Sequence, residues 1–166
     1  MIDRIVFYPA NESRFDAGIA QLLQSAYVEG GFTAAETAAK LFAIGEVKKR
    51  GEILLAIAGD GVVTGMVILG SEKNPYKQVA ESGEAEMQLL ATLPGHRHQG
   101  LGEALVAAFE NQARGAGLTR AVLSTQPTMV AAHNLYKKLG YARNNQRDWR
   151  RADREFWAFE KTLVTL

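Results

Sequence analysis

The chain of 166 residues contains no cysteine, and its three histidines show none of the spacings typical of metal-binding helices. The first absence excludes disulfides, thiolate metal sites and a cysteine nucleophile, and the second leads us to expect no metal site. No apolar run approaches the roughly 18 residues of a membrane span, and the segment Met1–Arg4 does not open a signal peptide. We therefore expect no membrane partner and a cytoplasmic location.

A surplus of one charge sign is also missing. The chain has 19 lysines and arginines against 18 aspartates and glutamates, for a net charge of +1. Such a balance gives no field that would attract nucleic acid, so we expect no nucleic-acid partner. Neither the Gly-x-Ser-x-Gly elbow of serine hydrolases nor the Gly-Lys-Ser/Thr of a P-loop is present.

What is present centres on residues 84–117. A strand-like run over 84–92 is followed by a polar, glycine-bearing turn over 94–102 and then by a helix. The helix is predicted from apolar residues that recur at one face of a 3.6-residue period. These residues are Leu101, Ala104, Leu105, Ala108 and Phe109.

The order strand, glycine loop, helix start is typical of an anion site. The first N–H groups of a helix have no intrahelical acceptor, and the helix dipole places partial positive charge there. Gly100 and Gly102 remove side chains that would keep a phosphate from the backbone, and Arg97 adds a full charge. The alternative is an ordinary strand-to-helix turn that needs glycine for its dihedral angles.

The pattern Arg97-x-x-Gly100-x-Gly102 after a strand resembles the R/Q-x-x-G-x-G/A pyrophosphate loop of the GNAT-family N-acetyltransferases. A second segment of that family, A-x-x-x-Y-x-x-x-G-F/Y, is similar to a stretch of this chain downstream. The matching residues there are Ala132, Tyr136, Gly140 and Tyr141.

The resemblance implies an acyltransferase that moves an acetyl group from acetyl-CoA, as co-substrate, to a primary amine by direct attack in a ternary complex. Backbone of the 84–92 strand would pair with the peptide-like pantetheine arm. The family often has an Asn seven residues before the tyrosine that contacts the cofactor arm. This chain has Met129 there, so the nearby Asn134 is the candidate for that contact. The implied cofactor-binding residues are Leu90, Ala91, Thr92, Arg97, His98, Gln99, Gly100, Leu101, Gly102, Glu103 and Asn134.

For catalysis, the resemblance implies Tyr136 as the acid that protonates the leaving thiolate and Glu86 as a candidate base. A phenol of pKa ~10 can donate to a developing thiolate. Glu84 is a second choice of base, and water or backbone carbonyls could serve instead. The alternative for Tyr136 is a packing role beside Leu135 and Leu139. The alternative for the two glutamates is a pair of ordinary carboxylates on one strand face.

The element order predicts one α/β domain over residues 1–166. Its expected architecture is a mixed, mostly antiparallel sheet of about seven strands with helices on both faces. Strands are expected at 2–8, 52–58, 62–69, 84–92, 120–125, 141–146 and 155–163. Thr33-x-x-Glu36 predicts a capping box at the start of a second helix that runs to about Arg50.

The acceptor side is expected to involve Tyr27, Phe32 and Phe42, unless these are core aromatics. Several arginines between 143 and 154 predict either a recognition edge for a carboxylate-bearing acceptor or a solvated hairpin with internal ion pairs. In the family this hairpin is also a frequent dimer contact, so a homodimer with Trp149 at its interface is a further expectation. The expected partner is a small-molecule or peptide amine; the rival function is a non-catalytic acyl-CoA-binding sensor.

Overall fold

The structure is a computed structural model that describes residues 3–164. Residue 2 of the expected first strand and the ends of the expected 1–166 domain therefore lie outside the described residues. The described part has eight strands rather than about seven. They are β1 (Arg4–Tyr8), β2 (Glu52–Ile57), β3 (Val63–Ser71), β4 (Glu84–Thr92), β5 (Arg120–Thr125), β6 (Ala142–Arg143), β7 (Trp149–Arg151) and β8 (Arg154–Thr162).

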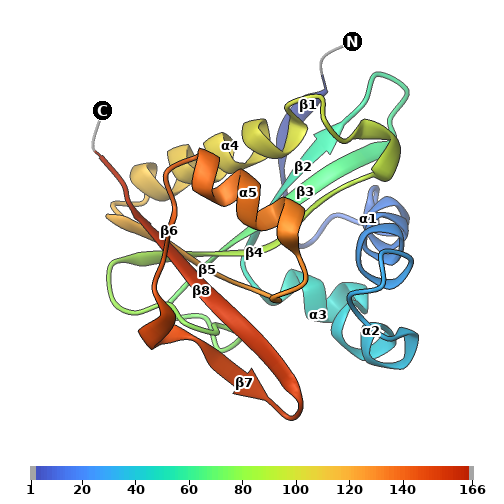
Figure 1. Cartoon of the computed structure of the whole chain (residues 1–166). Helices are drawn as coiled ribbons and strands as arrows, with labels where there is room; N and C mark the ends of the chain where they lie inside the picture. The colour runs from blue at the N-terminus through green and yellow to red at the C-terminus, as the bar shows by residue number, and fades with distance from the viewer. Residues whose placement is uncertain (1–2, 165–166) are drawn as a thin grey trace.

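The sheet is mixed and mostly antiparallel, as expected. Its order is β1-β2-β3-β4-β5-β8-β6, with β7 paired only to β8. Only the β4–β5 pair is parallel, because a helix crosses over between these two strands. In Figure 1 the β7–β8 hairpin projects from the sheet, away from the end where β1 lies.

Helices cover both faces of the sheet (Figure 1). On one face α4 buries Leu105 and Phe109 in a core that Tyr136 of α5 also joins. On the other face α1 buries Ile19 and Leu22 in a second core. The helices are α1 (Asp16–Leu23), which continues as a π-helical turn η1 (Gln24–Val28), then α2 (Ala35–Leu41), α3 (Ile44–Lys48), α4 (Leu101–Gly115) and α5 (Val130–Lys138), with short 3-10 turns η2 (Pro94–His96) and η3 (Asn145–Arg147).

Two local predictions are wrong. The Thr33-x-x-Glu36 capping box does not form: Ala34 is the N-cap residue of α2, no side chain caps it, and Thr33 is buried. The second helix does not run unbroken to Arg50 but is divided into α2 and α3 at Phe42 and Ala43. The Thr33 side chain is thus buried in the fold and does not make the local hydrogen bonds that the motif predicts.

The last strands also differ from expectation. The expected strand 141–146 is only two residues long, β6, and a 3-10 turn follows it. The hairpin is made instead by β7 with β8, where Trp149 faces Phe156 and Arg151 faces Arg154. None of the helices within residues 3–164 is both long and apolar enough to cross a lipid bilayer.

Candidate active site

The site begins where β4 separates from β5. These strands pair only from Glu84 to Met87 of β4, so the last residues of β4 have no partner on that side. The separation coincides with a β-bulge against β3, where the register shifts between Met66 and Ile68 and Leu89 has a φ of 49°. A non-glycine residue in the left-handed region is unusual and marks a locally constrained backbone. The bulge turns the backbone of Leu90–Thr92 toward the opening between the strands.

The second part is the loop before α4. Gly100 is the N-cap of α4 with a φ of 79°, and His98 has a φ of 61°. Among the described residues, no backbone N–H from His98 to Glu103 donates to a backbone acceptor of a turn or cap, whereas Ala104 N–H donates to Gly100 O at 3.0 Å. Successive free N–H groups at a left-handed turn and a helix start form an anion-binding concavity.

A cavity of about 600 Å³ joins these two parts. It is lined by the end of β4, the loop before α4, α5 and the η1–α2 segment. Of the expected cofactor-binding residues, Gln99 and Asn134 do not line it. Those that do are Leu90, Ala91, Thr92, Arg97, His98, Gly100, Leu101, Gly102 and Glu103.

Three further lining residues were also expected from the sequence: Tyr136 as the acid, and Tyr27 and Phe32 on the acceptor side. Phe42 does not line the cavity but packs against Tyr27, with ring centroids 5.2 Å apart. The spacing of apolar residues in α5 is the one signal that could have identified its cavity-facing side. The additional lining residues are Ala26, His96, Met129, Ala131, Ala132, Leu135 and Lys138.

Tyr136 faces the cavity from α5 and is only 7% exposed. Its ring packs on Tyr141 and Phe159, and no hydrogen bond of its hydroxyl is found among the described residues. Burial raises the pKa of Tyr136 well above its usual value, and the nearby Tyr27 raises it further. The phenol is thus held in its protonated form with its hydroxyl free to donate.

Tyr27 lies across the cavity from Tyr136. Its hydroxyl donates to the carbonyl oxygen of Leu90 at 3.4 Å, beside the bulge. Burial raises the pKa of Tyr27 to about 12, and the positive charge of Arg50 acts in the opposite direction. Two protonated phenols and the end of β4 therefore surround the same part of the cavity.

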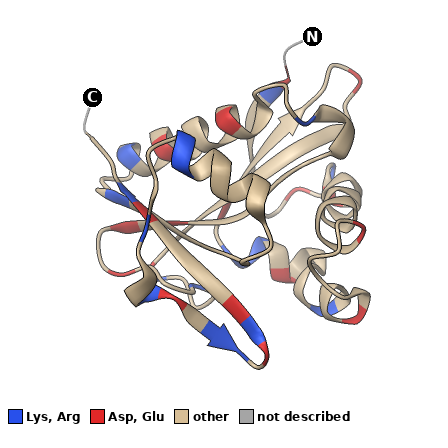
Figure 2. Cartoon of the chain, viewed as in Figure 1, with Lys and Arg blue, Asp and Glu red and all other residues tan. Residues whose placement is uncertain are grey.

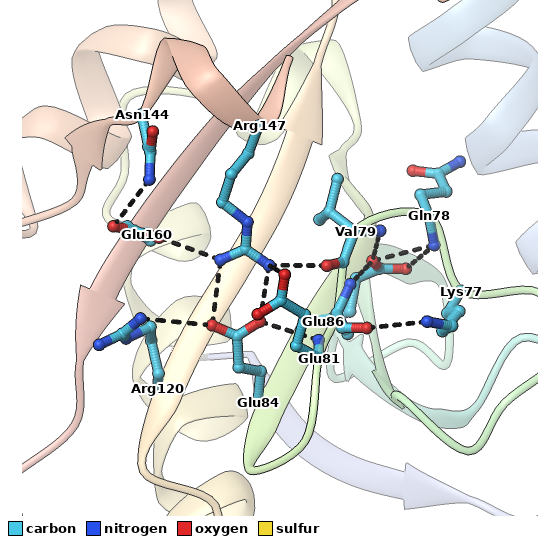
Figure 3. Close-up of polar contacts among 11 residues, drawn as sticks. Lys77, Gln78, Val79, Glu81, Glu84, Glu86, Arg120, Asn144, Arg147 and Glu160 are labelled. Carbon is cyan, nitrogen blue, oxygen red and sulfur yellow. Dashed lines mark hydrogen bonds and ion pairs between the residues drawn. The ribbon is translucent and has the colours of Figure 1, made fainter. Parts of the chain in front are cut away.

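Glu86 occupies a different environment from the one its expected role requires. It is fully buried and does not line the cavity. Its carboxylate accepts from the backbone N–H of Gln78 at 2.9 Å and of Val79 at 2.6 Å (Figure 3). It also accepts from the N–H of Ala80 at 3.0 Å and from the side-chain amide of Gln88. These bonds occupy both carboxylate oxygens, so the structure does not bring Glu86 together with Tyr136.

Glu84, the second choice, is equally engaged. Arg147 donates to both of its oxygens, at 2.7 and 3.0 Å, and the N–H of Glu81 donates at 2.9 Å (Figure 3). Burial alone would raise the pKa of Glu84, but the bonds from Arg147 and from the Glu81 amide hold that pKa below its usual value. Arg147 also donates to Glu160 at 3.0 Å, so one guanidinium links β4 and β8, which lie on either side of β5.

The arginine-rich segment 143–154 makes several contacts within itself and with β8. Arg143 pairs with Asp148 and stacks over Trp157, and Arg151 stacks over Trp149. Trp149 in turn donates to the Ser124 hydroxyl at 2.8 Å. Figure 2 shows basic and acidic segments following one another along β7 and β8. The Arg143–Asp148 pair matches the alternative of a hairpin with internal ion pairs, whereas Arg147 pairs with Glu84 of β4 and Glu160 of β8.

Comparisons with known proteins agree with this geometry. The model of the acetyltransferase (GNAT) family matches residues 17–141, more than half of the chain. An aminoglycoside N(6')-acetyltransferase type 1 from Klebsiella aerogenes is 35% identical over 101 residues; the match covers 60% of this chain and 65% of that relative.

Several solved structures share the fold. An acetyltransferase from Streptococcus agalactiae superposes with a TM-score of 0.78 at 20% identity, over 97% of this chain and 98% of that one. The PaiA N-acetyltransferase from Thermoplasma acidophilum, solved in complex with coenzyme A, gives a TM-score of 0.75 at 13% identity, over 98% and 99%. The chain therefore belongs to the GNAT family of acetyltransferases.

Proposed function

We propose that this protein transfers the acetyl group of acetyl-CoA to a primary amine by direct attack within a ternary complex. The observation that carries the proposal is the single cavity that joins the free N–H groups of the α4 start to the open end of β4 and to Tyr136. The family's use of acetyl-CoA fits the residues present, since a diphosphate needs N–H donors and positive charge. His98–Gly102 supply the donors, and Arg97 lines the same cavity.

The end of β4 suits the other half of the co-substrate. Pantetheine is peptide-like, so the backbone of Leu90–Thr92, which has no strand partner on the β5 side, can hold it as a further strand would be held. The Leu90 N–H is our candidate donor to the oxygen that gains charge when an amine attacks a thioester. The co-substrate supplies the thioester, and the chain supplies its alignment with the amine.

Two proton transfers remain. Tyr136 is the proposed acid for the thiolate, because burial keeps its hydroxyl protonated and no protein acceptor occupies it among the described residues. Glu86 was the sequence-based candidate for the base, but its hydrogen bonds support a role in holding the 78–80 loop. We assign removal of the amine proton to water near the Leu90 carbonyl oxygen, to which Tyr27 already donates.

The experiment is thiol release from acetyl-CoA measured across a panel of amines, with coenzyme A binding measured separately by calorimetry. The proposal expects both binding and amine-dependent release of thiol. Binding without release for any amine would favour the non-catalytic sensor. Absence of coenzyme A binding would contradict the proposed cofactor site itself.

A further inference from the structure

Arg50, between α3 and β2, is a partly buried cation without a counter-charge. Its Nη1 donates to the side-chain oxygen of Gln88 at 3.3 Å and its Nη2 to the carbonyl oxygen of Leu41 at 3.2 Å. Its Nε is buried and has no hydrogen-bond partner within the described part of the chain. Both partners of the guanidinium are neutral, and none of the ion pairs found among residues 3–164 includes Arg50.

Other arginines with a comparable position do have carboxylate partners. Arg147 pairs with Glu84, and Arg143 pairs with Asp148. A charge taken out of water costs free energy unless an opposite charge and hydrogen bonds compensate for it. Burial accordingly lowers the pKa of Arg50, although a guanidinium stays charged at any physiological pH. A partner from outside the described chain would restore the balance.

The charges that face Arg50 do not supply this partner. Glu46 of α3 acts on it electrostatically, but the Glu46 carboxylate is already bonded to Lys49 at 3.1 Å and to the Tyr76 hydroxyl at 2.9 Å. Arg151 of the β7–β8 hairpin adds a second positive charge and opposes the first. Glu86 lies one side chain further away, because its carboxylate accepts from the Gln88 amide and from the backbone N–H groups of residues 78–80. No carboxylate of the described residues therefore pairs directly with Arg50.

Arg50 itself does not line the cavity, but its two hydrogen-bond partners connect it to the proposed acceptor end. Gln88, its hydrogen-bond partner, precedes Leu90 of the cavity wall by two residues on β4. Tyr27 lines the cavity, and the positive charge of Arg50 acts to lower the pKa of its hydroxyl. Tyr27 packs against Phe42, which follows the other partner residue, Leu41. The guanidinium is thus held between the β4 wall and the α2 side of the site.

We propose that the acceptor amine carries a carboxylate that pairs with the Arg50 guanidinium, so that the substrate class is an amino acid or a peptide with a free carboxyl group. This inference rests on the proposed N-acetyltransferase function. A charge-assisted pair of this kind accounts for the cation without a counter-charge, and Arg151 adds to the preference for an anion. An aminoglycoside, which is a polycation, would meet repulsion at the same position.

The first test compares amines in matched pairs, each amino acid or dipeptide with its carboxamide, and includes kanamycin as a polycation. We expect kcat/KM for the free carboxylate to exceed that of its amide by about 10- to 100-fold, the value of one charge-assisted hydrogen-bond pair. Arg50→Gln should remove this preference through KM and leave coenzyme A binding unchanged. The control is Arg150→Gln, which removes an exposed arginine of the hairpin and should keep the preference.

The second test does not depend on turnover. The Nε–H resonance of Arg50 is assigned by its disappearance in Arg50→Gln and is followed during titration with acetate and, separately, with acetamide. Saturable movement with acetate alone supports the site. No movement with acetate, or equal movement with both, overturns the proposal, as does efficient turnover of kanamycin with no effect of Arg50→Gln. A protein that fails to bind coenzyme A would contradict the proposed function, while the acetate titration would still decide on Arg50.

Discussion

Replacing Glu86 by glutamine separates a structural carboxylate from a catalytic one. In the structure Oε1 accepts from the N–H groups of Gln78, Val79 and Ala80, and Oε2 accepts from the Gln78 N–H as well and from the side-chain amide of Gln88. A glutamine with its oxygen at the Oε1 position keeps the three backbone bonds. Its NH₂ group then faces the Gln88 amide, so these two donors are both left without an acceptor. A flip of the Gln88 amide would move the mismatch to Arg50, which donates to the Gln88 oxygen.

The magnitude follows from the two donors left without an acceptor. Each buried unsatisfied donor costs about 1–3 kcal/mol, so we expect a loss of about 2–6 kcal/mol in the free energy of unfolding. For a chain of this size each kcal/mol lowers Tm by about 2–4 °C, which places the expected decrease at about 4–24 °C. A general base, in contrast, contributes about 10²- to 10⁴-fold to kcat and need not affect Tm.

The assay is thermal unfolding of Glu86→Gln together with kcat for the best amine of the panel, measured well below Tm. Glu52→Gln is the matched control: Glu52 is also a strand carboxylate, but it is exposed and accepts one side-chain bond, from Gln112 at 2.8 Å. We expect a clear decrease in Tm for Glu86→Gln alone and a kcat within about tenfold of wild type. An unchanged Tm with a kcat lower by two orders of magnitude would refute this reasoning and restore Glu86 as the base.

Two further predictions concern the acid and the ion-pair network. Tyr136→Phe should lower kcat by about 10²-fold or more and leave the Kd of coenzyme A unchanged; an equal loss of both would contradict the acid role. Because the pKa of Tyr136 is raised, its protonated form persists to higher pH, so kcat should show no decrease from phenol ionisation up to pH ~10, and a decrease below that pH would argue against it. Arg147→Met removes the hydrogen-bonded cation of Glu84 and Glu160, leaving Glu84 only the more distant Arg120 at 3.7 Å, and should cost about 3–5 kcal/mol of stability, measured by denaturant unfolding, whereas the exposed Arg150→Met should not.

The sequence was sufficient where structure depends on local patterns. The strand, glycine loop and helix of residues 84–117 form as predicted, because each has its own periodicity or turn chemistry. The hairpin around Gly59–Gly61 forms for the same reason, between β2 and β3. The order of elements was enough to place the helices on both faces of the sheet.

It was not sufficient where long-range contacts decide. Thr33 has the residue types of a capping box, yet it is buried and does not cap α2. The left-handed conformation of Leu89 follows from the bulge against β3 and has no sequence signal of its own. Whether an arginine is paired depends on contacts between distant segments, so Arg147 and Arg50 could not be told apart before the fold was known.

The central claim, a diphosphate held on the free N–H groups at the start of α4, is tested most directly with two glycine variants. Gly100 and Gly117 have φ values of 79° and 78°, and a Cβ at either position meets no protein atom within 4 Å. Gly100→Leu and Gly117→Leu should therefore share the same backbone strain, about 1–2 kcal/mol.

Calorimetric titration with coenzyme A distinguishes the two positions. The account predicts that Gly100→Leu weakens binding by about tenfold or more, or by at least 1.4 kcal/mol, while Gly117→Leu binds as wild type does. Equal affinity in both variants, or no heat from the wild-type protein at millimolar coenzyme A, would contradict it.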